Sequence, residues 1–155
     1  EELFNKYHDR VPFVRDLMHE TSRWASREGE IRTLLGRGCR FDKWEPAQFG
    51  MHTPMTWEDA VKKYGENRIR RAFTYKALNK LIQGSAADMT KKSMLDLYKE
   101  GIIAHIQIHD ELDLSVESPE QAKKVVEIME NAVKLDVPNK VDYESGKNWG
   151  DIYDK

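Results

Sequence analysis

The sequence predicts an α+β fold in which antiparallel strands pack against long helices, and three observations support this prediction. Residues 102–116 alternate apolar and polar side chains, which is typical of half-buried strands. Residues 66–98 carry apolar side chains at helical spacing. The length of 155 residues suits one domain, and the single cysteine excludes an internal disulfide, so we expect a reducing cytoplasm.

Start and stop signals predict two helices and a ribbon in the first part of the chain. Residues 2–7 read as the tail of a helix, and residues 11–28 as a second helix that ends at Gly29. Residues 30–41 then predict a two-stranded ribbon that turns at residues 36–38, where two glycines flank an arginine.

A loop and a long helical stretch come next. Residues 42–55 contain two prolines and a glycine and predict a loop. Thr56 is placed to cap a short helix that ends at Gly65. The helical spacing of residues 66–98 predicts helix throughout, with a break into two helices at Gly84.

An acidic turn interrupts the alternating segment 102–116. His109, Asp110 and Glu111 stand between its two halves, and no Asn-Gly or Gly-Gly pair offers another turn. We therefore expect a hairpin with both carboxylates at its tip, where a hard divalent cation can bind. The tripeptide alone leaves open the alternative that both acids are solvated turn residues.

The last part of the chain predicts one more helix and one more strand. Ser118 is placed to cap a helix that begins at Pro119 and runs to Val133. Residues 139–145 then predict a closing strand.

Charge is distributed unevenly, although the net charge is only -2. Residues 62–92 contain nine Lys and Arg against two acids, whereas residues 93–155 contain seven against fourteen. This asymmetry indicates a polyanion at one surface and cations near another. An ordinary solvated helix face would give the same pattern.

A polar stripe is expected on the basic helix. Four polar side chains recur at every fourth position, namely Arg71, Tyr75, Asn79 and Gln83. Asn and Gln can donate hydrogen bonds to the acceptors that every base pair shows in the minor groove, and Arg and Lys can meet phosphates. The stripe therefore suits duplex DNA, with a solvated stripe as the alternative.

Three blocks carry a resemblance to a known family. They read ALNKLIQGSAADMTKKSM, AHIQIHDELDLSVES and VKLDVPNKVDYESGKNWGDIY. Their order and spacing resemble the C-terminal palm of family A DNA polymerases, the bacterial DNA polymerase I type and its phage relatives. Upstream the likeness is looser, and residues 41–55 look more phage-like.

The resemblance implies roles for individual residues. Asp110 would be the metal-binding carboxylate of the third conserved motif, Glu111 an auxiliary carboxylate, and His109 a neighbour of the primer terminus. The DNA-binding side chains would be Gln83, Asn79, Tyr75, Arg71, Lys76 and Lys80. The family often has Arg at the position of Tyr75, and Lys76 or Arg71 could substitute for it.

The resemblance also implies a larger assembly. Residues 1–65 would follow the fingers and residues 66–155 would form an antiparallel palm sheet with the metal-binding hairpin, packed on long helices within a right-hand polymerase fold. The activity would be DNA-directed DNA synthesis with two Mg²⁺ ions, completed by an Asp upstream of this chain. The partners would be primer-template DNA, a deoxynucleoside triphosphate and the upstream polymerase segment or subunit.

Two further expectations concern the cellular location of the protein and whether the chain is a whole enzyme. No stretch approaches the ~18 apolar residues of a membrane span, so we expect no membrane and the cytoplasm of a bacterial or phage-infected cell. Only 39% of the residues are hydrophobic, which is lean for a self-contained globule. The resemblance implies that this chain supplies only half of a two-metal site, so we expect a trimmed fragment or a split subunit that is inactive alone.

Two alternatives remain. The chain could be a non-catalytic duplex DNA-binding module or accessory subunit that uses its basic surface. It could also be a metal hydrolase built on His105 and His109, but four residues of strand separate these by about 13 Å at ~3.3 Å per residue, too far for one ion unless the strand bends.

Overall fold

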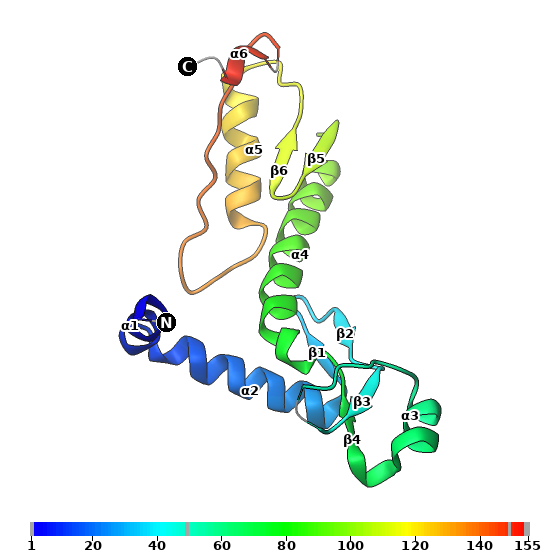
Figure 1. Cartoon of the computed structure of the whole chain (residues 1–155). Coiled ribbons are helices and arrows are strands. Elements are labelled where there is room, and N and C mark those ends of the chain that lie inside the picture. Colours follow the sequence, from blue (N-terminus) through cyan, green and yellow to red (C-terminus); the bar gives the residue numbers. More distant parts are fainter. Residues whose placement is uncertain (1, 49, 149, 154–155) are drawn as a thin grey trace. The chain divides into compact units, whose positions relative to one another are not determined.

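The computed structural model describes residues 2–48, 50–148 and 150–153 (Figure 1). Two compact units divide the chain, one covering residues 1–85 and the other residues 86–155. The longest helix, α4 (Ala77–Lys99), contributes to both units. The described residues contain helices and three separate two-stranded antiparallel sheets, which confirms the mixed α+β class.

The first unit begins with two helices, α1 (Glu2–Arg10) and α2 (Pro12–Glu28). Gly29 ends α2 as predicted, because it adopts the left-handed conformation with φ +77° and its N–H donates to the Ala25 carbonyl. The ribbon of β1 (Glu30–Arg32) and β2 (Gly38–Arg40) is also confirmed.

The turn of this ribbon lies earlier than predicted. The Gly36 N–H donates to the Thr33 carbonyl at 2.9 Å, so the chain reverses across Leu34 and Leu35. Gly36 closes the turn with φ +85°, and Gly38 already pairs with Arg32 in the strand.

Two predictions for residues 42–76 are wrong. The predicted loop contains strand β3 (Trp44–Pro46), and the predicted helix contains its partner β4 (Ile69–Arg71). The two strands pair antiparallel, with Trp44 opposite Arg71 and Glu45 opposite Arg70. Short 3-10 turns at Glu66–Arg68 and Thr74–Lys76 flank β4, so α-helix begins only at Ala77.

The short helix α3 (Trp57–Tyr64) confirms its predicted ends. The Thr56 side chain accepts a hydrogen bond from the Asp59 N–H at its start, and Gly65 follows its last turn. A small core joins α2, the ribbon and the first turn of α4. It consists of Ala25, Ile31, Phe41 and Ala77, with Cys39 and Leu81 packed against it.

Helix α4 corrects another prediction, because it continues through Gly84 without a break. Gly84 lies where the ribbon approaches the helix: a Cβ built there would be 2.8 Å from the Thr33 methyl carbon. The glycine therefore accommodates a neighbour, and its presence does not interrupt the helix.

The second unit contains the end of α4, a hairpin of β5 (Ile106–Ile108) and β6 (Glu111–Asp113), and helix α5 (Pro119–Asn131). The Ser118 side chain caps α5 as predicted by accepting from the Gln121 N–H. Leu97, Ile102 and Val125 form its core with Leu112 and Leu114 of the hairpin segment.

The end of the chain departs from the prediction. Residues 139–145 form no strand, although the Val141 N–H is held by the Glu130 side chain at 3.2 Å. A last short helix, α6 (Gly150–Tyr153), follows. None of the helices in the described part of the chain combines the length and apolar character that a membrane span requires.

Candidate metal-binding hairpin and nucleic-acid surface

The β5–β6 hairpin turns at the acidic tripeptide, as its sequence predicts. Ile108 pairs with Glu111, which leaves His109 and Asp110 as a two-residue loop. His109 has φ +52°, a left-handed conformation that is uncommon outside glycine and for which histidine is enriched. The loop is therefore tight, and its first residue is held in a sparsely populated conformation.

Hydrogen bonds brace this loop from the strands. The Gln107 side-chain amide donates to the His109 carbonyl at 2.5 Å. The His105 N–H donates to the Asp113 carbonyl at 2.8 Å, and the His105 ring lies 3.1 Å from the Ser115 hydroxyl. Gln107 is a candidate functional residue that the sequence patterns did not single out. His105 is engaged with Ser115, which gives no support to a His105–His109 metal site.

The hairpin does not present one continuous apolar face. Paired residues in an antiparallel ladder project to the same side, and here Ile106 pairs with Asp113 while Gln107 pairs with Leu112. The even-numbered residues of β5 therefore project to one side of the hairpin, and the even-numbered residues of β6 project to the other side. Leu112 and Leu114 pack into the core of the second unit, whereas Ile106 stays 43% exposed.

Both carboxylates of the tripeptide are available to a ligand. Asp110 and Glu111 are exposed, and no ion pair among the described residues involves either of them. Two adjacent carboxylates repel each other unless a cation joins them, and their oxygens are the ligands that Mg²⁺ prefers. No group of three or more metal-ligating side chains occurs in the described part of the chain, so the pair is at most part of a metal site.

A third carboxylate lies on the same hairpin. Asp113 comes two residues after Glu111 in β6 and is half-buried, and its Oδ2 atom is buried without a hydrogen-bond partner. Leaving such an atom unsatisfied costs about 1–3 kcal/mol. Sequence alternation alone gave no signal for it, because Asp113 falls among the polar positions.

Helix α4 carries the candidate minor-groove residues on the side that faces away from the small core. Ala77 and Leu81 pack against the core, and Asn79 and Gln83 each follow one of them by two residues, or about 200° of rotation. Both amide side chains are exposed. The predicted spacing of Asn79 and Gln83 on one helix is confirmed, and Ile82 beside them is 57% exposed.

The other predicted stripe residues are placed differently. Tyr75 lies in a 3-10 turn and is 62% exposed. The Lys76 ammonium sits over the rings of Phe73 and Tyr75, at 5.1 and 5.6 Å from their centroids. Lys80 leans over the Phe41 ring at 5.5 Å and reaches the Cys39 sulfur at 3.5 Å.

Arg71 lies in strand β4, so it does not continue the helical stripe. Its guanidinium stacks over the Trp44 ring at 4.6 Å and donates to the Phe41 carbonyl at 3.0 Å. A Cβ built at Gly29 would be 2.6 Å from the same guanidinium, so the chain passes directly beside it. These contacts join the end of α2 to the β3–β4 pair.

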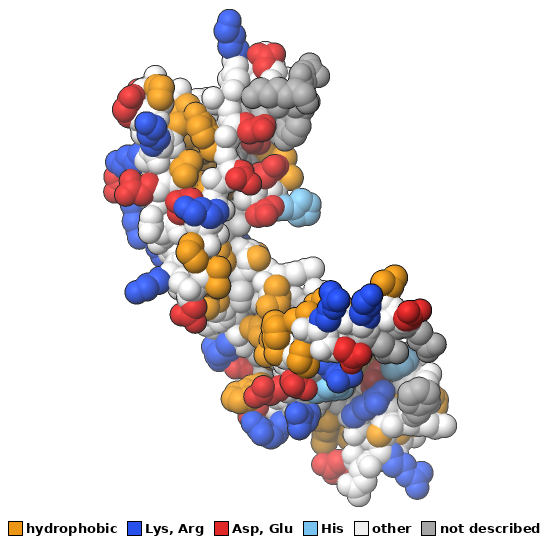
Figure 2. All heavy atoms as spheres, turned by 90° about the vertical axis from the view of Figure 1, so that its left-hand side faces the viewer, with side chains coloured by type: hydrophobic (Ala, Val, Ile, Leu, Met, Phe, Trp, Pro, Cys, Tyr) orange, Lys and Arg blue, Asp and Glu red, His pale blue; other side chains and the backbone are white. Residues whose placement is uncertain are grey.

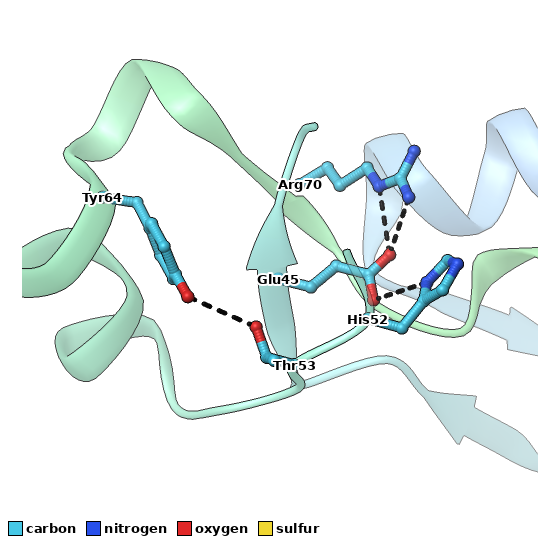
Figure 3. A network of polar contacts seen from close by, with 5 residues as sticks. All are labelled: Glu45, His52, Thr53, Tyr64 and Arg70. Carbon is cyan, nitrogen blue, oxygen red and sulfur yellow. Dashed lines mark hydrogen bonds and ion pairs between the residues drawn. The ribbon is translucent and has the colours of Figure 1, made fainter. Parts of the chain in front are cut away.

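A buried carboxylate organises the other side of β3–β4 (Figure 3). Glu45 is 4% exposed and accepts hydrogen bonds from Arg70 at 3.0 Å, while the His52 ring lies 3.3 Å away. Figure 3 shows the Glu45 carboxylate between these two side chains. Nearby, the hydrogen bond between Tyr64 and Thr53 and the neighbouring Lys63 lower the pKa of Tyr64. This network was not predicted from the sequence.

Apolar side chains also remain on the surface. Figure 2 shows them in orange among the charged side chains of the face that it displays. Exposed examples include Phe13 at 65%, Tyr98 at 67% and Val137 at 72%.

This combination of helices and small antiparallel sheets is similar to that of a DNA polymerase domain. The fold is similar to the POL domain of Pol1 from M. smegmatis, solved in complex with DNA primer-template and dNTP, with a TM-score of 0.60 and 29% sequence identity over 87% of this chain and 22% of that one.

Sequence comparison gives the family. Residues 1–151 match the model of DNA polymerase family A, and the chain belongs to that family. It is 34% identical to a DNA-directed DNA polymerase of Pseudomonas phage M6 over 96% of this chain and 19% of the relative. It is also 34% identical to DNA polymerase I of Geobacillus stearothermophilus, over 97% of this chain and 16% of the relative. The chain thus spans less than a fifth of the length of these relatives.

Proposed function

We propose that this chain is the C-terminal palm portion of a DNA-directed DNA polymerase that adds deoxynucleotides to a primer 3′ end. Residues 1–65 would follow the fingers, and residues 66–155 would form the palm. The observation that carries the proposal is the exposed Asp110-Glu111 pair at the tip of a tight hairpin in a family A member. The chain would depend on an upstream palm and fingers.

The acidic tip fits a divalent metal ion. Asp110 and Glu111 supply hard oxygen ligands without a competing cation in the described residues. Mg²⁺ is usually held by one or two carboxylates together with water and substrate phosphates, so two carboxylates suffice for this chain's share. The remaining protein ligand would be an Asp upstream of this chain. When bound, the two ions would activate the primer hydroxyl and stabilise the charge of the leaving pyrophosphate.

The residues of this chain would contribute position and charge. The tight turn, braced by Gln107, would hold Asp110 and Glu111 in a fixed orientation, and His109 would lie against the primer terminus. Asn79 and Gln83 would donate to minor-groove acceptors of primer-template DNA. Tyr75, Lys76, Lys80 and Arg71 would lie along the same duplex, although the guanidinium of Arg71 is engaged within the fold.

The test is a primer-extension assay with Mg²⁺, nucleotides and a primer-template. The 155-residue chain should give no extension alone, and extension should appear when the upstream palm and fingers of the same polymerase are added. Extension by the chain alone would contradict the shared metal site. Absence of extension from the whole polymerase would remove the proposed activity.

A non-catalytic duplex DNA-binding module is the second candidate, favoured by the basic stretch of residues 62–92. Such a module would bind duplex DNA with an affinity that falls steeply as salt rises, because phosphate contacts release counterions. The polymerase proposal requires the same salt-dependent binding of duplex DNA, and it also requires metal-dependent primer extension by the assembled protein. Duplex binding without extension would favour the module.

A further inference from the structure

The β1–β2 ribbon contacts helix α4 at two consecutive residues. The Leu34 N–H donates to the Ser85 hydroxyl at 3.0 Å, and the Arg37 guanidinium donates to the Gly84 carbonyl at 2.9 Å. Within the ribbon, the Arg37 N–H donates to the Thr33 hydroxyl at 3.0 Å. These residues form what we call the ribbon clamp: Thr33, Arg37, Gly84 and Ser85.

Gly84 allows this contact because it has no side chain. A Cβ at this position would lie 2.8 Å from the Thr33 methyl carbon and 3.4 Å from the Arg37 Nη2 atom. Gly84 is helical, so no left-handed conformation requires glycine there. Glycine weakens a helix relative to alanine. The glycine is therefore explained by the close approach of the ribbon, which a side chain at this position would prevent.

The residue before the clamp is Gln83. Its side chain is exposed, and in the described part of the chain it makes no hydrogen bond that would orient it. The direction in which it projects therefore depends on the rotation of α4 about its axis. Gly84 and Ser85 lie about 100° and 200° further around the axis of α4 than Gln83, so contacts that hold them also fix that rotation.

We propose that the ribbon clamp is a positioning element that aims Gln83 and Asn79 at the minor groove and thereby sets discrimination against mismatched primer ends. The inference rests on the proposed polymerase function. Hydrogen bonds weaken steeply as the angle between donor, hydrogen and acceptor departs from linear. A shift of the helix by a fraction of an ångström at the clamp would therefore weaken base-pair readout while leaving the acidic hairpin's ligands unchanged.

The first variant is Gly84→Ala in the polymerase that contains this chain. The measured quantity is the ratio of kcat/KM for matched and mismatched primer ends. This ratio should fall about fivefold, as for Gln83→Ala, which corresponds to one lost hydrogen bond. The double variant Gly84→Ala/Gln83→Ala should fall no further, because both changes remove the same readout.

Thr33→Ser provides a rescue. It removes the methyl carbon that meets the new Cβ and keeps the hydroxyl that accepts from the Arg37 N–H. The double variant Gly84→Ala/Thr33→Ser should therefore recover the wild-type ratio to within about twofold. A general loss of stability would lower the melting temperature without changing the ratio.

Arg37→Ala tests the clamp without adding atoms, in case Gly84→Ala does not fold. It removes the bond to the Gly84 carbonyl and should also lower the ratio, whereas Arg40→Ala, which removes a cation from the same ribbon, should not. An unchanged ratio in a folded Gly84→Ala or Arg37→Ala enzyme, or a Gly84→Ala defect that Thr33→Ser leaves intact, overturns the proposal. A wild-type enzyme that extends no primer refutes the polymerase function instead.

Discussion

Replacing Arg71 with lysine separates a structural role from a DNA-binding role. Lysine keeps the positive charge but lacks the planar guanidinium that stacks on Trp44 and donates to the Phe41 carbonyl. A phosphate contact would survive this change, because an ammonium also meets phosphates. The two contacts within the fold would not. Arg71→Lys should therefore destabilise the chain more than it weakens DNA binding.

The size of the effect follows from the two contacts that are lost. A cation–π contact contributes about 0.5–2 kcal/mol, depending on how far it is removed from water. A hydrogen bond from a charged donor contributes about 1.5–3 kcal/mol. Arg71 is half-buried and lysine recovers part of each contact. We therefore expect a loss of about 2 kcal/mol in the free energy of unfolding, below the sum of the two contributions.

Urea unfolding followed by tryptophan fluorescence is the suitable assay, because Trp44 is itself one of the partners. At an m-value of about 2 kcal/mol/M, the midpoint should fall by about 1 M. Arg68→Lys is the matched control, since Arg68 is exposed on the adjacent 3-10 turn. It should change stability by less than about 0.5 kcal/mol. If Arg71→Lys also changed the free energy of unfolding by less than about 0.5 kcal/mol, the structural role of Arg71 would be refuted.

Three further predictions concern the candidate sites. Asp110→Asn in the assembled polymerase should reduce extension at least about a thousandfold at an unchanged melting temperature, because an amide binds Mg²⁺ poorly; near wild-type turnover would exclude Asp110 from the metal site. Gln83→Ala should increase extension of mismatched primer ends and leave the Mg²⁺ optimum in place, since about 1 kcal/mol of hydrogen bonding is lost away from the metal; a shifted optimum with normal mismatch extension would contradict its role. Asp113→Val should raise the free energy of unfolding of the 155-residue chain by about 1–3 kcal/mol in urea titrations, because it removes an unsatisfied buried oxygen; a destabilised variant would show that Asp113 has a partner.

Features set by a few neighbouring residues were predictable from the sequence. Gly29, Thr56 and Ser118 end or begin helices through contacts that lie within four residues along the chain. The acidic turn belongs to the same class, because the strands on both sides alternate and Asp110 stands between them.

Features that depend on distant contacts were not predictable. Strands β3 and β4 are three residues each and lie more than twenty residues apart, and the helical spacing around Ile69 misled the prediction. Gly84 looked like a helix break because its neighbour Thr33 is remote in sequence. The unpaired oxygen of Asp113 likewise depends on packing that alternation cannot show.

The candidate site was therefore predictable in its residues more than in its arrangement. His109, Asp110 and Glu111 do meet at one tip, and Asn79 and Gln83 do share one side of a helix. Arg71 and Tyr75 lie outside that helix, because a strand and a 3-10 turn precede it.

The two-residue loop at His109 and Asp110 leaves this hairpin little room to vary in length. An insertion of one residue that shifted the pairing by one position would turn Leu112 out of its core and carry Glu111 to the other side of the sheet. Packing and ligand placement would then fail together. Point substitutions can thus alter the chemistry of this tip, whereas insertions and deletions cannot be accommodated there. Loop exchange between distant polymerases should accordingly succeed at the acidic turn only when the incoming loop also has two residues.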